Sequence, residues 1–304
     1  MFVAMNYSEG ENWMRQQLQT IYDEGEAASI TALVLEHITE QPRMERMSKN
    51  EYKLSEDKEQ NLKEITSRLL KHEPVQYILG EAYFAGLKLF VDRDVLIPRP
   101  ETEELIHWII EDVKKGSKNV FIQNKGEADA TDYLKILDVG TGSGCIALSL
   151  KNSLPKAEVW GCDTSDAALN IARRNGSALD IRVDFVGLDF LDPLQRKQLP
   201  TVDIIVSNPP YIPKKESTTL LQNVVAYEPH LALFVPDNDA LVFYKALAQF
   251  GRDRMYKNGT IYCEINEALG KEVIALFNTY GYNSVEIRKD MQGKNRMIKA
   301  TYNE

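Results

Sequence analysis

Short apolar runs alternate with amphipathic helical patterns from Tyr133 onward, and this alternation limits the possible folds more than any other feature. Strands are predicted at residues 135–139, 158–162, 181–186, 203–207, 260–265, 284–288 and 296–300. Helices are predicted at 146–151, at 165–175 with Gly176 as the end, at 241–255 and at 268–280. This order predicts an α/β fold: a doubly wound, mostly parallel seven-stranded sheet with helices on both faces. Because only a short polar turn separates the last two strands, we expect one of them to run antiparallel.

The first hundred residues have a different pattern. Residues 10–72 carry apolar side chains at helical spacing, and Ser55 is predicted to cap one of these helices. Residues 83–91 contain a glycine between two extended apolar runs, which predicts a β-hairpin. Pro98 and Pro100 stiffen the next segment, and a helix is predicted from Glu101 to about Val113. We therefore expect a small all-helical N-terminal domain (1–80), a β-hairpin linker (81–100) and a larger α/β domain (101–304).

Composition limits the possible partners. The formal net charge is −9, whereas a protein that binds a long phosphate backbone normally carries a positive charge. No uncharged apolar run approaches the roughly 18–20 residues needed to span a bilayer, and the N-terminus lacks the pattern of a secretory signal. Cys145, Cys162 and Cys263 have no C-x-x-C spacing, so we expect free thiols in a reducing cytoplasm. The four histidines have no metal-ligand spacing, and no metal site is expected.

A glycine-rich loop follows the first predicted strand of the α/β region. Its sequence is Asp138-Val139-Gly140-Thr141-Gly142-Ser143-Gly144, which lacks the G-x-G-x-x-G spacing of dinucleotide-binding proteins. Glycine permits a ligand to approach the backbone and the N-terminus of the next helix closely. The five residues from Gly140 to Gly144 are therefore candidate cofactor-binding residues, although a tight strand–helix turn alone also favours glycine.

Acidic residues follow the next two predicted strands. Asp163 can accept hydrogen bonds from both ribose hydroxyls of an adenosine group, or it can instead cap the following helix. Asp189 and Phe190 offer a carboxylate and an aromatic face to an adenine ring. The order of acidic residue, glycine loop, Asp163 and Asp189 resembles class I S-adenosylmethionine-dependent methyltransferases. This resemblance implies S-adenosyl-L-methionine as the cofactor and S-adenosyl-L-homocysteine as the product.

The tetrapeptide Asn208-Pro209-Pro210-Tyr211 comes directly after a predicted strand, where ligands bind in open α/β sheets. Both prolines lack an N–H group and have a fixed φ, so the Pro209 carbonyl can face a ligand from a rigid loop. With the Asn208 side-chain oxygen and the Tyr211 ring, the loop offers two acceptors and an aromatic face to a planar –NH₂ group. Holding both hydrogens localises the nitrogen lone pair and orients it for methyl transfer. All four are candidate catalytic and substrate-binding residues, and Asn208 is also a candidate cofactor contact.

Amino-group methyltransferases share this tetrapeptide, and three further segments narrow the resemblance. Residues 74–80 (PVQYILG), 96–103 (LIPRPETE) and 227–229 (YEP) are similar to the bacterial peptide chain release factor glutamine methyltransferases, and the similarity covers essentially the whole chain. It implies methylation of the glutamine side-chain amide in the Gly-Gly-Gln motif of class I release factors. It also implies that Gly140 to Gly144 and Asp163 hold the cofactor, that Phe190 packs by the adenine, and that Asn208 to Tyr211 hold the glutamine. Residues 119–132 are longer than the family's usual connection and 233–239 lack the glycines expected there, so neither segment is assigned a function.

Several alternatives remain open from the sequence. Arg99 and Glu101 either face the active site as substrate-binding residues or pair to fix the linker. A nucleic-acid amino-methyltransferase acting on adenine or guanine would share the tetrapeptide, but it would need a basic groove or a target-recognition domain. A non-catalytic binding module would tolerate loss of Asn208 or of the glycine loop, and both are intact. We predict a monomeric cytoplasmic enzyme that acts on class I release factors through its helical domain, without metal, stable nucleic-acid binding or membrane association.

Overall fold

The computed structural model describes residues 5–48, 52–116, 133–219 and 222–302. The segment 119–132, whose length has no assigned role, lies outside the described residues. The chain divides into two compact units: Met1–Glu81 together with Leu221–Tyr227, and Ala82–Leu220 together with Glu228–Glu304.

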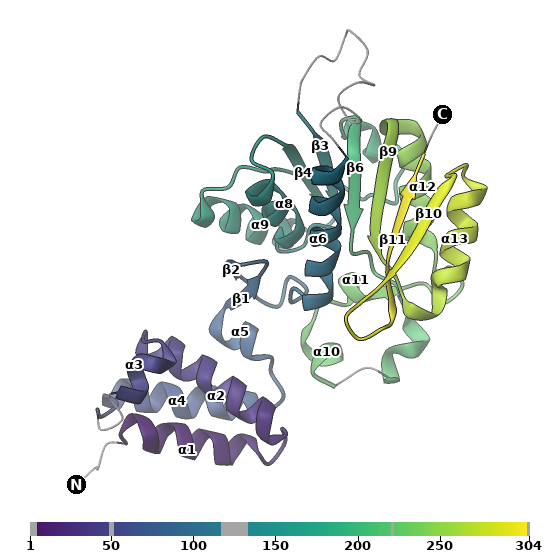
Figure 1. Ribbon diagram of the computed structural model, residues 1–304. Helices are drawn as coiled ribbons and strands as arrows, with labels where there is room; N and C mark the ends of the chain where they lie inside the picture. Colours follow the sequence, from purple (N-terminus) through teal and green to yellow (C-terminus); the bar gives the residue numbers. More distant parts are fainter. Residues whose placement is uncertain (1–4, 49–51, 117–132, 220–221, 303–304) are drawn as a thin grey trace. The chain divides into compact units, whose positions relative to one another are not determined.

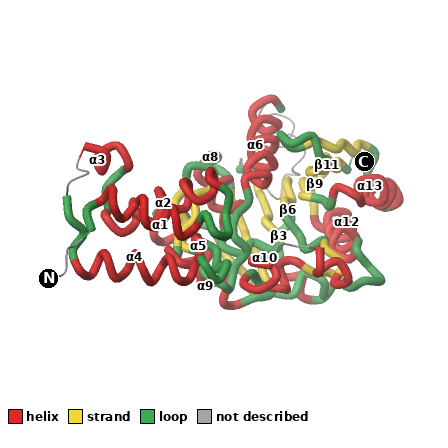
Figure 2. The backbone as a smooth tube through the Cα atoms, turned by 90° about the horizontal axis from the view of Figure 1, so that it is seen from below, coloured by secondary structure: helices red, strands yellow, loops and turns green. Residues whose placement is uncertain are grey.

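Helices form the first unit (Figures 1 and 2). They are α1 (Tyr7–Leu18), α2 (Glu24–Thr39), α3 (Arg43–Ser48), α4 (Glu56–Leu69), α5 (Val75–Leu79) and α10 (Gln222–Tyr227). The apolar faces of α1, α2 and α4 share one core. Asn6, Asp23 and Ser55 each accept a hydrogen bond from a backbone N–H of the first turn, which confirms the predicted cap at Ser55. The Tyr227 hydroxyl donates to the Lys71 carbonyl at 3.0 Å and ties α10 to the end of α4.

The predicted hairpin and the helix after it are both present. Strands β1 (Glu81–Phe84) and β2 (Leu87–Phe90) pair across a turn at Ala85 and Gly86, whose φ values are 48° and 78°. Positive φ at both central residues gives the turn type that matches the twist of paired strands. Helix α6 (Pro100–Lys115) begins with a proline, at a position where no backbone N–H is needed.

A seven-stranded sheet in the order β10-β11-β9-β6-β3-β4-β5 forms the centre of the second unit (Figure 1). The strands are β3 (Lys135–Val139), β4 (Glu158–Asp163), β5 (Asp184–Gly187), β6 (Val202–Ser207), β9 (Met255–Glu264), β10 (Ser284–Lys289) and β11 (Asn295–Thr301). Strand β11 pairs antiparallel with β9 and β10, whereas β9, β6, β3, β4 and β5 pair in parallel. The mostly parallel sheet and the antiparallel pairing of the last two strands are therefore confirmed. A separate short pair joins β7 (Ile212–Pro213) to β8 (Phe234–Val235).

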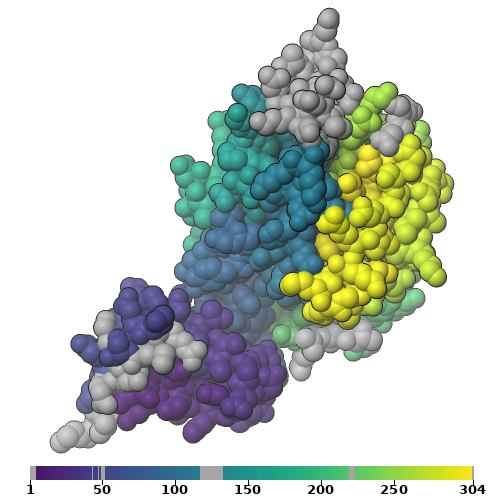
Figure 3. All heavy atoms as spheres, in the orientation of Figure 1, coloured from purple at the N-terminus to yellow at the C-terminus, as the bar shows by residue number. Residues whose placement is uncertain are grey.

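Helices cover both faces of this sheet. Helices α6 and α8 (Cys145–Ser153) pack on one face, and α12 (Val242–Arg254) and α13 (Gly270–Thr279) pack on the other. Within β3, Ile136 packs into the apolar core on the side of α6 and α8, and Leu137 packs into the core on the side of α12 and α13. This is expected because successive side chains of a strand point to opposite faces of the sheet. Figure 3 shows α6 at the surface beside the C-terminal strands, where Lys299 of β11 donates to Asp112 of α6 at 2.6 Å.

The helix that we expected to end at Gly176 is longer. Helix α9 runs from Asp166 to Leu179 and packs against β4 and β5. Gly176 is buried, and a Cβ there would lie 3.0 Å from the carbonyl oxygen of Ile181, so this glycine permits close packing rather than ending the helix. Asp180, with a φ of 54°, is the left-handed C-cap. Strand β5 accordingly begins at Asp184, three residues later than expected.

Candidate active site

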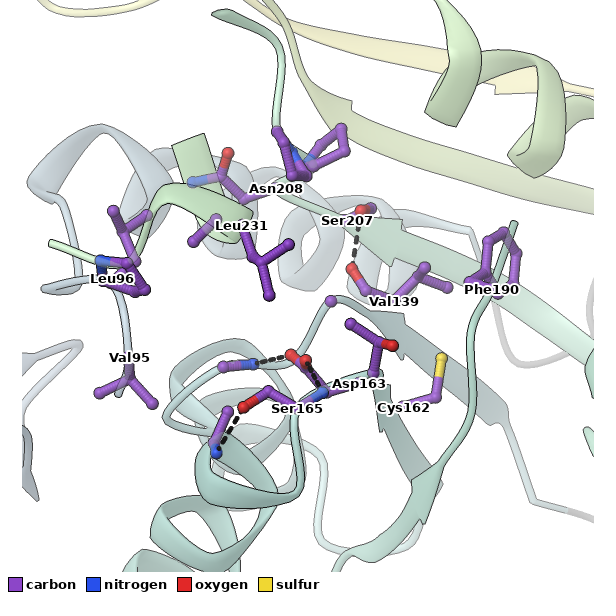
Figure 4. Close-up of a pocket in the computed structure, with 18 of the residues that line it drawn as sticks. Val95, Leu96, Val139, Cys162, Asp163, Ser165, Phe190, Ser207, Asn208 and Leu231 are labelled. Atoms are coloured by element: carbon purple, nitrogen blue, oxygen red, sulfur yellow. Dashed lines mark hydrogen bonds between the residues drawn. The ribbon is translucent and has the colours of Figure 1, made fainter. Parts of the chain in front are cut away.

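A pocket of about 150 Å³ lies at the carboxyl ends of the parallel strands β3, β4, β5 and β6 (Figure 4). Residues that line it from these ends are Gly140 and Gly142, Asp163 to Ser165, Leu188 to Phe190, and Ser207 to Pro210. The wall also includes Asp94 to Leu96, of which Leu96 begins the segment 96–103 noted above, and Pro229, Leu231 and Ala232 at the short helix α11 (His230–Leu233). The sheet thus brings together the glycine loop, the acidic residues and the tetrapeptide, as the topology of open parallel sheets predicts.

The glycine loop forms one wall of the pocket. Gly140, Gly142 and Gly144 have φ values of 73°, 54° and 81°, a backbone region that other residues rarely adopt. A Cβ on Gly140 or Gly142 would meet no atom within 4 Å, so the space beside both is open to a ligand. A Cβ on Gly144 would instead crowd three side chains at 3.1–3.2 Å. Thr141, Ser143 and Gly144 are not among the described residues that line the pocket.

Asp138, fully buried at the end region of β3, holds this loop in place. Its Oδ2 accepts hydrogen bonds from the Thr141 hydroxyl at 2.7 Å and from the backbone N–H of Ala147 at 3.2 Å. Burial raises the pKa of Asp138 to about 7, although both hydrogen bonds act to lower it. Thr141 therefore shapes the loop through Asp138, with its side chain turned to the protein interior.

The Asp163 carboxylate lies between the glycine loop and the start of α9 (Figure 4). Oδ2 accepts from the backbone N–H of Gly142 and Oδ1 from that of Ser165, both at 2.9 Å. Each oxygen keeps further lone-pair capacity for a ligand. Ser165, whose hydroxyl accepts from the Ala168 N–H at 3.2 Å, is the N-cap of α9, so the capping alternative for Asp163 is wrong. Burial raises the pKa of Asp163, and the backbone N–H donors oppose this shift.

Asp189 and Phe190 also line the pocket, but they are held differently. Asp189 is exposed, and its Oδ1 accepts from the Leu191 N–H at 2.8 Å. Phe190 is 5% exposed and packs edge-on against Phe250, with ring centroids 5.4 Å apart. Phe190 is therefore a core side chain that also supplies an apolar wall to the pocket.

The tetrapeptide continues from the end of β6. The Ser207 hydroxyl donates to the Val139 carbonyl at 2.7 Å and fastens this end of β6 to β3. Asn208, Pro209 and Pro210 line the same pocket as Gly140 and Gly142, and Figure 4 shows Asn208 at its wall. Tyr211 is not among the described lining residues, and its contribution of an aromatic face stays a prediction.

Two polar residues that the sequence analysis missed stand directly behind the tetrapeptide. The Asn208 Nδ2 donates to the Thr102 hydroxyl at 3.1 Å, and this hydroxyl donates to Glu264 Oε2 at 2.7 Å. The Tyr211 hydroxyl donates to Glu264 Oε1 at 3.1 Å. Burial raises the pKa of Glu264, while both hydroxyl donors and the nearby Arg296 act to lower it. One sequence signal could have identified Glu264: it is a carboxylate at the end of an otherwise apolar strand. Burying a charge is costly unless it has hydrogen-bond partners, so such a residue is expected to have them.

Arg99 and Glu101, which we considered as substrate-binding residues, are not among the described residues of the pocket wall. Arg99 pairs with the buried Glu228, with a distance of 2.6 Å between Nη2 and Oε1. Glu101 accepts a long hydrogen bond of 3.5 Å from Gln292. The two residues thus pair with other partners, and not with each other as the linker alternative supposed.

Two features that the described residues lack bear on other classes of function. Among the described residues, no cluster of three or more His, Cys, Asp or Glu side chains is arranged to hold a metal ion. Over the same part of the chain, no helix combines the length and apolarity needed to cross a membrane.

The pocket fits an adenosine-containing methyl donor by its chemistry. Asp163 offers carboxylate lone pairs of the kind that accept ribose hydroxyls, and the open space beside Gly140 and Gly142 permits close approach to the backbone. Phe190 supplies an apolar surface for a base, and Asn208 offers a polar group from the neighbouring strand. Together with the strand order, these features define a class I methyltransferase.

Comparisons with known proteins agree and identify the family. Residues 11–80 match the family described as "PrmC N-terminal domain", and residues 113–231 match "Methyltransferase small domain". The release factor glutamine methyltransferase of Flavobacterium psychrophilum is 40% identical over 94% of this chain and 96% of its own length. That of Bacteroides thetaiotaomicron is 39% identical over 95% and 97%, respectively. The chain belongs to the release factor glutamine methyltransferase family.

A solved structure shows the same fold at lower sequence similarity. The hMettl16 catalytic domain in complex with MAT2A 3′UTR hairpin 6 matches with a TM-score of 0.53 and 16% identity, covering 82% of each chain. At this identity the likeness is one of fold alone.

Proposed function

We propose that this protein transfers a methyl group from S-adenosyl-L-methionine to the side-chain amide nitrogen of the release factor glutamine that lies in the Gly-Gly-Gln motif. The observation that carries the proposal is the arrangement of one pocket, in which Asp163 and the glycine loop face Asn208, Pro209 and Pro210. A donor site and an amide site in one cavity are what a direct methyl transfer requires. The family relationship supports the release factor as the substrate.

On this proposal, the donor is held by the walls from β3 and β4. Asp163 accepts hydrogen bonds from the ribose hydroxyls, and Gly140 and Gly142 allow the donor to lie against the backbone. Asp189 and Phe190 border the base, the latter as an apolar wall. The cofactor, when bound, would supply an electrophilic methyl group on a sulfonium and leave as S-adenosyl-L-homocysteine, while the substrate amide nitrogen gains the methyl group and loses one of its two hydrogens as a proton.

The tetrapeptide holds the substrate amide. Asn208 Oδ1 and the Pro209 carbonyl accept the two amide hydrogens, and the rigid Pro209-Pro210 backbone keeps both acceptors in place. An amide nitrogen is a weak nucleophile because its lone pair is delocalised into the carbonyl. Two fixed acceptors favour the form in which the lone pair is localised on nitrogen, and they orient it toward the methyl group.

The helical region is the proposed contact for the rest of the release factor. A glutamine side chain alone cannot identify one protein among many, so selectivity requires further contacts with the correct partner. We assign this role to residues 1–80, with 81–100 as the linker and 101–304 as the catalytic domain. The match of residues 11–80 to a domain of this family supports the assignment.

A substrate panel tests the proposed function. The protein is incubated with S-adenosylmethionine carrying a labelled methyl group and, separately, with a class I release factor, transfer RNA, ribosomal RNA and DNA. We expect label in the release factor alone, because a net charge of −9 disfavours nucleic-acid substrates. Label in a nucleic acid, with the release factor unlabelled, would show that the site is an exocyclic amino-methyltransferase.

A further inference from the structure

A continuous chain of hydrogen bonds links the pocket to a buried carboxylate on the neighbouring strand. It runs from Asn208 Nδ2 to the Thr102 hydroxyl at 3.1 Å, and from that hydroxyl to Glu264 Oε2 at 2.7 Å. Thr102 is 1% exposed and Glu264 is 3% exposed, so water does not compete freely for these groups. The three residues come from α6, the end of β6 and the end of β9, which are far apart in sequence.

The order of donors along this chain follows from the number of hydrogens available. An ionised carboxylate only accepts, so Glu264 draws the single hydroxyl hydrogen of Thr102 toward itself. The Thr102 oxygen then has only lone pairs left, and Asn208 must present its –NH₂ group to it. Because the amide group is planar, the Asn208 Oδ1 is turned to the side opposite Thr102.

Several groups favour the ionised form of Glu264, although burial raises its pKa. The Tyr211 hydroxyl donates to its other oxygen, Oε1, at 3.1 Å, and Arg296 lies near enough to favour the negative charge. The negative charge of Glu101 acts in the opposite direction and raises the pKa of Glu264. The Tyr244 hydroxyl donates to the Glu264 backbone carbonyl at 3.1 Å and fixes this end of β9. Glu264 thereby anchors both ends of the tetrapeptide, Asn208 indirectly through Thr102 and Tyr211 directly by a hydrogen bond.

We propose that Glu264 and Thr102 are positioning residues that orient the Asn208 side-chain amide, with Oδ1 toward the substrate, and thereby select a glutamine side chain over a glutamate. The inference rests on the proposed function, in which Asn208 Oδ1 accepts a hydrogen from the substrate –NH₂ group. A glutamate carboxylate would meet two acceptors, Asn208 Oδ1 and the Pro209 carbonyl, and would be repelled. If the Asn208 amide were rotated by half a turn, its –NH₂ group would face the substrate and could donate a hydrogen bond to a glutamate carboxylate.

Binding discrimination tests the proposal. Affinities are measured by calorimetry, with S-adenosyl-L-homocysteine present, for a class I release factor and for its Gln→Glu variant at the motif glutamine. The Thr102→Val variant removes the hydroxyl at nearly constant volume, and we expect the preference for glutamine to fall about tenfold or more. Thr102→Ser restores the hydroxyl and should restore the preference. Glu264→Gln replaces one acceptor by a donor and should reduce the preference in the same direction.

Thr260→Val is the matched control. Thr260 is a buried threonine on the same strand as Glu264, and its hydroxyl bonds to that of Thr301 at 3.2 Å. Its replacement should leave both the preference for glutamine and the affinity for S-adenosylmethionine unchanged. An unaltered preference in Thr102→Val, with Thr102→Val folded and its donor affinity normal, would overturn the proposal.

A second measurement needs no substrate and separates this inference from the proposed function. Nuclear magnetic resonance of the free protein follows hydrogen exchange at the Asn208 side-chain –NH₂, assigned by its loss in Asn208→Asp. We expect faster exchange in Thr102→Val and no change in Thr260→Val. Equal exchange in all three proteins would refute the orienting role. Failure of the wild-type protein to bind or methylate any release factor, with the exchange result as expected, would refute the proposed function alone.

Discussion

The Asp163 carboxylate at the end of β4 accepts a hydrogen bond of 2.9 Å from the backbone N–H of Gly142, in the loop after β3. This bond joins the two parts of the proposed donor site into one unit. Removing Asp163 would take away the acceptors for the ribose and also release the loop.

The Asp163→Ala variant should bind S-adenosylmethionine about tenfold or more weakly, because a hydrogen bond to a charged group contributes roughly 1.5–3 kcal/mol. Calorimetry measures the effect directly. Asp166→Ala is the control, since Asp166 is an exposed carboxylate at the start of α9 that does not line the pocket. Equal donor affinities in the wild type and Asp163→Ala would contradict the assignment of this site.

Asn208→Ala should lower kcat about a hundredfold or more, because the loss of one preorganised polar contact in an active site has an effect of this size. Turnover is measured with both the release factor and the donor at saturating concentrations, so that weaker binding does not account for the loss. Near-normal turnover on the release factor would show that the tetrapeptide does not hold the reacting amide.

Asp138 makes the stability of the protein depend on pH. Burial raises its pKa to about 7 in the folded state, from an ordinary value of 3.8, so the folded protein binds the proton more tightly than the unfolded chain does. This group therefore favours folding below about pH 4, and its contribution is lost progressively as the pH rises through about 7.

The Asp138→Asn variant keeps an oxygen that can accept from Thr141 and Ala147, but it does not titrate. We expect the free energy of unfolding, measured by urea denaturation between pH 4 and 8, to fall less steeply with pH than in the wild type. A parallel pH dependence in the two proteins would mean that Asp138 titrates at an ordinary value.

Removal of residues 1–72 should depress kcat/KM for an intact release factor far more than for a short Gly-Gly-Gln peptide, because the peptide lacks the proposed contacts with the helical region. The comparison requires that the shortened protein still unfolds cooperatively and still binds S-adenosylmethionine. Equal losses on protein and peptide would show that the helical region supports folding and that the catalytic domain alone recognises the partner.

The alternation of strands and helices along the chain, and a ligand pocket at the carboxyl ends of the strands, were predictable because both follow from local patterns. The apolar run 135–139 and the glycines after it predict a strand and a ligand-binding turn wherever they lie in the chain. The extent of α9 was not predictable, because Gly176 is placed by close approach to Ile181, a contact that only the folded structure contains.

The hydrogen-bond network behind Asn208 could not be predicted from the sequence either, because it joins residues that only the folded structure brings together. Thr102 and Glu264 are 162 residues apart, and although Thr102 lies in the segment 96–103, no spacing in the sequence links it to Glu264. Arg99 was noted as a possible active-site residue, but its partner Glu228 lies 129 residues away. Contacts between distant side chains arise from the packing of β9, β6 and α6, and that packing leaves no periodic signal.

Mass spectrometry of the methylated substrate tests the central claim most directly. An intact class I release factor is incubated with the protein and S-adenosylmethionine, digested, and sequenced by fragmentation. The account predicts a single added methyl group on the side-chain amide of the Gly-Gly-Gln glutamine, and none when that residue is changed to glutamate. A methyl group at another residue, or an unmodified release factor under conditions where the protein binds the donor, would contradict it.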